Sequence, residues 1–552
     1  MARCGARRPN CLDDFVLRFK GLRASPRYLL VLYVISFLDS VSYYAFSYAL
    51  IMHLAAEVGL PDAWAGLFYG IFGVCISISS FFLGFAADWL GVRNSICVAT
   101  SIGFVGRLAM AYAVLGRSAW LSTLLLCAVV GPCIALLGPP IPTAIKRFTR
   151  KDTRELGYTL NYGVVNVGAF MATPIVDILR LNTGDTVMLL PPYALLIAFT
   201  GLMQLPIFFA ALFGLRDEYM DEQTGEMRPF VAEGGDSNLK QRIKAVLAQA
   251  NFWRALTLVM CLMGVKSSFR YFDALFLPYV LRAYQDAASF PYLSLLALNP
   301  IIVIAATLTG ASTIITSRMT IVNSMLVGTF VGGVAPMCMA VGPYLTPIIL
   351  YVLCTSIGEV IWAPVAVTFL MSLTKNGEEG AYFALAGLPT FMGKVLTGGL
   401  TGGLLSVYCP QRYAAVGAVR RFVLAALDSF SEFVELHWSG LFGVESTLPG
   451  RALWMHWRDA VNASSTLLPP PPPQLWGAPE CSAVAIWGII GLTTLSSFFM
   501  LLAVRRYIAS VETVATPLLL QSEEDTEDIE LEGIVGPIII ENRAMDDDGE
   551  PM

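Results

Sequence analysis

Seven charged side chains lie inside long apolar runs of this sequence, and these residues have the chemistry to carry a function. They are Asp39, Arg107, Lys266, Arg270, Asp273, Glu359 and Lys394. A charge inside an apolar membrane segment is costly, so it usually faces a polar cavity or an opposite charge. Lys266, Arg270 and Asp273 are spaced i, i+4, i+7, which places them on one face of a helix. We therefore predict a polar cavity lined by residues of this set.

The four cations and three carboxylates of this set would leave such a cavity close to neutral. That balance favours a zwitterionic or anionic ligand over an organic cation. Four aromatic side chains would wall the cavity: Tyr43, Tyr44, Tyr271 and Trp362. For Arg107 and Lys394, a structural ion pair between helices is as well supported as a role in transport. All three histidines lie on the predicted external side, so a proton relay would use Asp39, Asp273 or Glu359.

The elements that must position these residues are membrane-spanning helices. The chain has 552 residues, of which 56% are hydrophobic and 14% are charged, and its mean hydropathy is +0.64. Soluble domains are roughly a quarter charged, so this composition excludes a soluble globular protein. A net charge of −5 gives no basic surface for nucleic acid. The eleven cysteines form no paired motif, and we expect neither a metal nor a cofactor.

About 20 apolar residues are needed to cross the hydrocarbon core, and twelve segments meet that requirement. They are 28–54, 64–87, 94–115, 118–143, 157–180, 189–214, 254–282, 291–315, 320–342, 344–372, 381–407 and 483–504. The predicted fold class is an all-α polytopic membrane protein with twelve transmembrane helices in two six-helix bundles.

The spans and the polar stretches between them divide the chain. We predict an N-terminal segment 1–27, a first bundle 28–214, a linker 215–251, a second bundle 252–504 that includes an extracytoplasmic loop 408–482, and an acidic, disordered tail 505–552. Lysine and arginine gather in the N-terminal segment and in every second short loop, so both termini are expected in the cytoplasm.

The predicted external loop has three features of its own. Its first part alternates apolar and charged residues at helical spacing, which favours an amphipathic helix on the membrane surface over a thirteenth span. Asn462 begins a glycosylation sequon. Cys409 and Cys481 bracket the loop and could form a disulfide or remain two free thiols. The sequon and the cysteine pair favour the plasma membrane or a lysosome-like or vacuolar membrane over mitochondria.

The loop after the second predicted span, residues 84–93, reads GFAADWLGVR. It resembles the GxLaDrxGrr loop of the major facilitator superfamily, keeping Gly84, Asp88, Gly91 and Arg93. This resemblance implies two six-helix bundles, alternating access around a central cavity, and a cytoplasmic gate loop in which Asp88 pairs across the bundle interface. Asp88 could also simply cap a helix, and the two roles are compatible.

Two further elements look like those of the proton-dependent oligopeptide transporter family. Residues 162–169, YGVVNVGA, resemble its FYxxINxGS element, and residues 358–364, GEVIWAP, resemble its GExxxSP element. The resemblance implies that Glu359 is a cavity carboxylate for a substrate amine and that Asn166 lines the pocket. In the first span, where that family has ExxERFxYYG, this chain has SFLDSVSYYA. Tyr43 and Tyr44 are kept, but Asp39 replaces two glutamates and Ser40 stands in place of the arginine.

The sequence thus predicts a secondary active transporter that moves a small polar solute, zwitterionic or anionic, with protons as a candidate coupling ion. The alternative is a transporter-like substrate sensor or interaction platform that uses the acidic tail. No catalytic motif supports a membrane enzyme. We expect the lipid bilayer and a small-molecule solute as partners, no nucleic acid, and a monomer.

Overall fold

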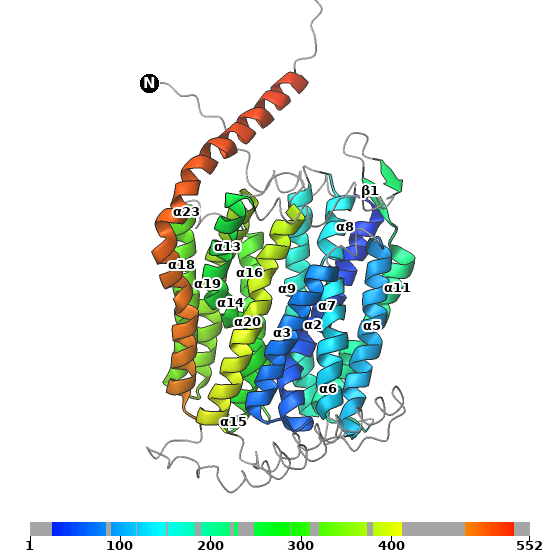
Figure 1. Cartoon of the computed structure of the whole chain (residues 1–552), viewed down its shortest axis with the longest axis vertical. Coiled ribbons are helices and arrows are strands. Elements are labelled where there is room, and N and C mark those ends of the chain that lie inside the picture. Colours follow the sequence, from blue (N-terminus) through cyan, green and yellow to red (C-terminus); the bar gives the residue numbers. More distant parts are fainter. Residues whose placement is uncertain are drawn as a thin grey trace, which may run out of the picture. The chain divides into compact units, whose positions relative to one another are not determined.

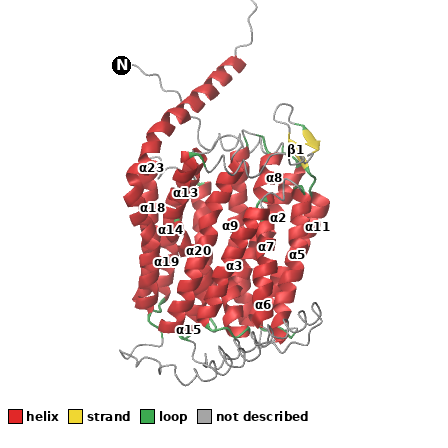
Figure 2. Ribbon diagram, in the orientation of Figure 1, coloured by secondary structure: helices red, strands yellow, loops and turns green. Residues whose placement is uncertain are grey.

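A helical membrane chain must satisfy its backbone hydrogen bonds within each apolar segment, and the described part of this chain is mainly helical (Figures 1 and 2). The computed structural model describes residues 25–83, 90–116, 119–150, 153–182, 189–220, 226–229, 248–287, 289–309, 319–372, 379–410 and 481–534. Residues 1–502 form one compact unit, and residues 503–552 form a second.

The first half of the chain contains helices for the first six predicted spans. They are α2 (Arg27–Met52), α3 (Asp62–Leu83), α5 (Val92–Ala113), α6 (Ala119–Leu125), α7 (Gly131–Leu137), α8 (Pro140–Phe148), α9 (Arg154–Asn182), α10 (Pro192–Leu202) and α11 (Gln204–Gly214). The fourth span is divided into α6, a π-helical turn (Leu126–Val130), α7 and α8, with Pro139 and Pro140 at the α7–α8 junction. Proline lacks a backbone N–H, which explains the break at this junction.

The second half contains helices for the other six. They are α13 (Ala250–Cys261), α14 (Met263–Tyr271), a π-helical turn (Phe272–Phe276), α15 (Leu277–Ala283), a 3₁₀ turn (Tyr292–Ala297), α16 (Leu298–Leu308), α18 (Ile321–Val334), α19 (Leu345–Ser372), α20 (Glu379–Tyr408) and α23 (Ala483–Ile534).

Within the described ranges, nine helices are long and apolar enough to cross a membrane, against the twelve spans predicted. The predicted span 254–282 is instead broken at Leu262 and again at the π-helical turn, and its charges lower its hydropathy. The span 291–315 contains a shorter apolar helix, Tyr292–Thr307, and residues 310–318 lie outside the described ranges. The span 381–407 lies within α20.

Two segments differ from the predicted organisation. Residues 218–229 of the predicted linker contain a small antiparallel pair of strands, β1 (Glu218–Met220) and β2 (Met227–Pro229), with Tyr219 opposite Arg228. α23 continues to residue 534, although its acidic part was expected to be disordered. Extending an existing helix avoids the cost of nucleation, and the Leu- and Glu-rich residues 518–532 favour that extension, whereas Pro517 disfavours it. The loop 411–480, with Asn462, lies outside the described residues.

α3 and α20 lie side by side and pack through glycines. A Cβ added at Gly398 would lie 2.3 Å from the carbonyl oxygen of Gly66, and one at Gly66 would lie 2.2 Å from the carbonyl oxygen of Gly398. Gly402 makes the same kind of contact with the carbonyl oxygen of Asp62, at 2.5 Å. Gly399 has open space around its Cβ position. Only one of each glycine pair in α20 therefore holds the two backbones together.

Gly398→Ala is expected to push α3 away from α20, because its methyl group would meet a backbone oxygen that no side-chain rotation can move. Overpacking of this kind costs about 1–3 kcal/mol. Thermal unfolding of the purified protein should show a lower midpoint for Gly398→Ala. Gly399→Ala, one residue along the same helix, is the matched control. It should leave the free energy of unfolding within about 0.5 kcal/mol of the wild-type value. Equal effects of the two substitutions would contradict the packing role.

Candidate functional site

The helices expose two ends, which we name by the residues found there. The distal face is the end where α2 leads into α3, where α9 leads into α10, and where α20 ends; it lies at the bottom of Figure 1. The proximal face is the opposite end, with β1, α8 and the start of α5. Asp39, Asn166, Glu359 and Lys394 each lie near the middle of a long helix, α2, α9, α19 and α20, and we call this level mid-depth.

One polar cluster joins the first and second halves of the chain at mid-depth. Arg270 Nη1 donates to Asp273 Oδ2 at 2.9 Å, within one turn of α14 and the π-helical turn that follows. The same nitrogen donates to the hydroxyl of Tyr43, on α2, at 3.2 Å. Tyr69, on α3, donates to Asp273 Oδ2 at 3.5 Å. The predicted spacing of Arg270 and Asp273 on one face thus brings them together, and the two tyrosines link them to the first half.

Lys394, on α20, reaches this cluster from another side. Its side chain is fully buried, and among the described residues Nζ makes no hydrogen bond. It lies 5.4, 5.0 and 4.7 Å from the ring centroids of Tyr43, Tyr69 and Phe72. A cation over three aromatic faces is attracted by the ring quadrupoles, so these rings hold the ammonium group in place of an anion.

A second cluster is built around Glu359 on α19. Asn299, on α16, donates to Glu359 Oε2 at 3.0 Å and to the hydroxyl of Ser356 at 3.1 Å. Tyr162, on α9, donates to Glu359 Oε1 at 3.2 Å. Glu359 therefore accepts one hydrogen bond from each half of the chain. Among the described residues its hydrogen-bond donors are neutral, so the carboxylate can still bind a ligand cation.

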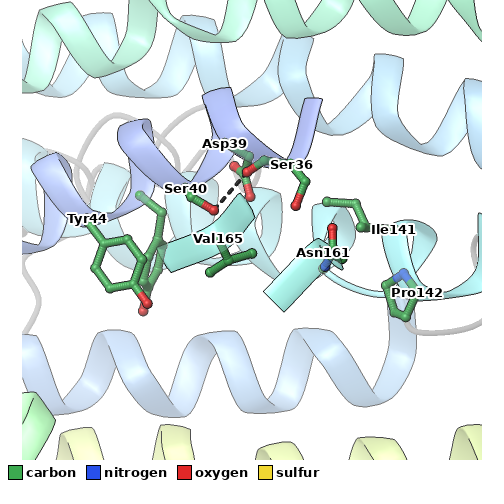
Figure 3. Close-up of a pocket in the computed structure, with 10 residues that line it drawn as sticks. Ser36, Asp39, Ser40, Tyr44, Ile141, Pro142, Asn161 and Val165 are labelled. Carbon is green, nitrogen blue, oxygen red and sulfur yellow. Dashed lines mark hydrogen bonds between the residues drawn. The ribbon is translucent and has the colours of Figure 1, made fainter. Parts of the chain in front are cut away.

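Asp39 lines a cavity of about 290 Å³ between α2, the α7–α8 junction and α9 (Figure 3). Ser36, Ser40 and Asn161 contribute polar atoms to its wall, and Tyr43 and Tyr44 also line it. The hydroxyl of Ser40 donates to the Ser36 carbonyl oxygen at 2.7 Å. The volume is large enough for several water molecules or a small polar group.

Other predicted site residues have different environments. Asn166 donates from Nδ2 to the carbonyl oxygen of Tyr162 at 2.9 Å, and Asn161 lines the Asp39 cavity. Tyr44 packs edge to face against Tyr43, with ring centroids 5.4 Å apart. Lys266 is partly buried on α14, one turn before Arg270.

Arg107, on α5, belongs to a network within the first half. It donates to the hydroxyl of Ser42, and to the carbonyl oxygen of Thr200 at 3.1 Å. Gln204 donates to the same Ser42 hydroxyl at 2.9 Å. The side chain is 1% exposed and ties α2, α5 and α10 together. These contacts favour a structural role for Arg107, in which it holds the helices together, over a role in transport.

The gate-loop motif is described only in part, because Gly84 and Asp88 lie outside the described residues. Gly91 has φ +80°, and a Cβ there would lie 2.6 Å from the carboxylate of Asp217. The backbone N–H of Arg93 donates to Asp217 Oδ1 at 3.2 Å. Glycine is required at this turn both for its positive φ and for the close approach of Asp217.

Near the distal face, two polar clusters bridge the halves. In the first, Arg282 at the end of α15 forms a bidentate pair with Asp62 at the start of α3, with distances of 2.7 and 2.9 Å. Arg282 also donates to the carbonyl oxygen of Cys409 at 2.8 Å. Cys409 is joined to Cys481 by a disulfide, which closes the chain segment of the predicted external loop.

The second distal cluster centres on Asp177 and Arg180 of α9. Arg180 pairs with Asp177 at 3.0 Å and donates to the carbonyl oxygens of Ala287 and Phe290 at 2.8 and 3.1 Å. Asp177 accepts from the backbone N–H and the hydroxyl of Ser294 at 2.7 and 2.9 Å. α9 is thus fastened to the segment between α15 and α16.

Sequence reasoning missed several of these partners, because they lie at predicted helix ends where charge is ordinary. Asp62, Asp177, Arg180 and Arg282 were not singled out, and Asn299 was noted only as a neighbour of a proline. The one signal available was that an asparagine within an apolar run needs a partner. Among the described residues, no group of three or more His, Cys, Asp or Glu side chains is placed to hold a metal ion.

Comparison with known proteins gives a family match over most of the chain. The model of the Major Facilitator Superfamily matches residues 32–408. A curated relative is an uncharacterized MFS-type transporter, YqjV, of Bacillus subtilis (strain 168), which is 22% identical over 359 residues that cover 64% of this chain and 80% of the relative.

Similar solved structures are transporters. The peptide transporter POT in complex with sulfate has a TM-score of 0.58 at 14% identity and covers 89% of this chain and 98% of its own. Tetrameric PepTSo2 has a TM-score of 0.57 at 14% identity, covering 88% and 99%. A POT family transporter in complex with 5-aminolevulinic acid has a TM-score of 0.54 at 14% identity, covering 74% and 98%. At these identities the similarity concerns the fold.

The Asp62–Arg282 pair should be energetically coupled, because both side chains are nearly buried and the geometry is bidentate. In a double-mutant cycle of Asp62→Asn and Arg282→Gln, measured by unfolding of the purified protein, we expect a coupling free energy above about 1 kcal/mol. The exposed pair Arg216–Glu218, at 3.9 Å, is the control and should give less than about 0.5 kcal/mol. Similar coupling energies at both sites would show that the distal pair contributes no more than a surface contact.

Proposed function

Because the chain belongs to the major facilitator superfamily, we propose that this membrane transporter is a secondary active transporter of a small zwitterionic or anionic solute, working by alternating access. The observation that carries the proposal is that the polar groups at mid-depth are shared between the halves. Arg270 is bonded to Tyr43, and Glu359 to Tyr162. A solute bound between the halves would replace these contacts with its own, which couples its binding to the distance between the halves.

The two mid-depth clusters differ in charge and suit the two ends of one solute. Glu359 accepts hydrogen bonds from the neutral side chains of Asn299 and Tyr162 and would bind an ammonium group. Arg270 and Lys394 are both cationic, and Asp273, which is bonded to Arg270, offsets only one of the two charges. Opposite charges at the two clusters favour a zwitterion over a simple cation. The POT family transporter solved in complex with 5-aminolevulinic acid is similar to this chain in fold.

Alternating access requires that the halves separate at one face while they close at the other. The distal clusters of Arg282 and Arg180, together with the glycine packing of α3 on α20, hold the halves together near the distal face. These contacts would have to break for a solute to enter from that side. We therefore assign the conformation described here to a state that is closed at the distal face.

Topology and coupling follow as parts of the same proposal. We propose that the proximal face and both termini lie in the cytoplasm, because lysines and arginines gather in the short loops at that face, and that the distal face is extracytoplasmic. Its disulfide fits an oxidising compartment and thus the plasma membrane or a lysosome-like or vacuolar membrane. The proton-accepting candidates are Asp39, Asp273 and Glu359, with Asp39 placed in a cavity that water can fill. We propose a monomer as the working unit.

Substituting Glu359 should weaken solute binding, and substituting Asp39 should weaken coupling to protons. In reconstituted vesicles supplied with a panel of amino acids, short peptides and organic anions, Glu359→Gln should lower uptake about 10–100-fold, the value of one or more charged hydrogen bonds. Asp39→Asn should remove the stimulation of uptake by a pH gradient. Glu218→Gln, on β1, is the matched control and should transport like wild type.

Two different outcomes would contradict these expectations. Uptake that tolerates both Glu359→Gln and Asp39→Asn would overturn the assignment of the cavity. If no solute of the panel is transported while one still binds the purified protein, the sensor function replaces transport.

A further inference from the structure

The cluster around Tyr43 contains more positive than negative charge. Arg270 and Lys394 both approach Tyr43, at 3.2 Å from its hydroxyl and 5.4 Å from its ring centroid. Asp273 is the carboxylate in hydrogen-bond contact with this cluster, and it bonds to Arg270 at 2.9 Å. If these three groups are ionised, the cluster has one cation in excess.

Lys394 is the cation that is left over. It is 0% exposed, and its Nζ makes no hydrogen bond with the described residues. A buried ammonium normally has an anion and two or three acceptors, since burial without them is strongly unfavourable. Cation–π contacts with Tyr69 and Phe72 offset part of that cost, but each supplies only about 0.5–2 kcal/mol. Two cations therefore share one carboxylate, Asp273, which is hydrogen-bonded to Arg270, while Lys394 Nζ has no hydrogen-bonded anion among the described residues.

We infer that Arg270 and Lys394 form the binding subsite for the carboxylate group of the solute, and that Asp273 is an internal counter-ion which the solute displaces from Arg270. The inference rests on the proposed function and names the chemical group by which the solute is held. A carboxylate between the two cations would give Lys394 the anion that it lacks. Arg270 could exchange Asp273 for that carboxylate without losing a charge-assisted hydrogen bond.

The surrounding rings restrict what fits in this subsite. Tyr43, Tyr69 and Phe72 come from α2 and α3 in the first half, whereas both cations come from the second half. A flat carboxylate can lie against the positive edges of these rings, and the Tyr43 hydroxyl can donate to it once Arg270 turns to the solute. The ammonium end would then extend toward Glu359, which belongs to the separate cluster on α19 and α16.

The experiment uses acetate as the minimal carboxylate and acetamide as its uncharged counterpart. Binding of each probe to the full-length protein in lipid nanodiscs is measured by saturation-transfer NMR. Asp273→Asn removes the internal competitor, so acetate should bind at least about ten-fold more tightly than to wild type, as expected for freeing one charged hydrogen bond. Adding Lys394→Met to Asp273→Asn should abolish that gain, and acetamide should show no gain in any variant.

Asp177→Asn is the matched control, because Asp177 is also a buried aspartate paired with an arginine three residues away. Its described contacts are with Arg180 and Ser294 and include no lysine, so acetate binding should stay at the wild-type level. Should Asp273→Asn not fold, wild type is compared with Lys394→Met, which should bind acetate at least about ten-fold more weakly.

Three results would overturn the inference: equal acetate binding by Asp273→Asn and the double variant, an equal gain in Asp177→Asn, or acetamide binding that follows acetate. The measurement involves no transport. A protein that binds acetate as described but moves no solute therefore refutes the proposed transport and keeps the subsite, and the converse pattern refutes only the subsite.

Discussion

The structure depends on one constraint: a charge buried among apolar helices must find a partner, because neither lipid nor a packed core can solvate it. Arg107 and Arg270 satisfy this constraint in different ways. Arg107 bonds to Ser42 and Thr200, all within the first half of the chain, so these contacts do not cross between the halves. Arg270 bonds to Tyr43 across the halves as well as to its own neighbour Asp273. The first arrangement stiffens one half, and the second ties the two halves together only while the contact lasts.

The fold was largely predictable because hydropathy acts on each segment separately. Twelve apolar segments of span length mark the helices, and the order and approximate limits of these helices follow from them. The departures are local backbone events. Residues 254–282 are interrupted at Leu262 and by a π-helical turn, and α6 to α8 share one predicted span. A hydropathy profile cannot predict an interruption of this kind. The charges of α14 indicate only that the segment is more polar than the other spans.

The sequence predicted which residues belong to the site, but it predicted few of the contacts between them. The spacing of Arg270 and Asp273 was enough to place them together, since one helix determines it. Which tyrosine meets Arg270, or which asparagine meets Glu359, depends on how α2 approaches α14 and how α16 approaches α19. Helical periodicity contains no information about these approaches. Asn299 is an example. Its hydrogen bonds to Ser356 and Glu359 explain why an amide lies in an apolar helix, but these partners can be identified only from the tertiary structure.

The distal contacts extend the same constraint to the membrane surface. Arg282 is held by two carboxylate oxygens and by the carbonyl oxygen of Cys409, and the disulfide with Cys481 fixes where that carbonyl lies. Here Arg282 and Arg180 each have a carboxylate partner. Opening this face would break the pair of Arg282 with Asp62 and the hydrogen bonds of Arg180 to Ala287 and Phe290. At mid-depth the balance differs, because Lys394 has aromatic rings where Arg282 has a carboxylate. A solute carboxylate can therefore stabilise the middle of the protein by more than it could stabilise the distal face. That difference is what a transporter needs if solute binding, rather than thermal opening alone, is to decide which face separates.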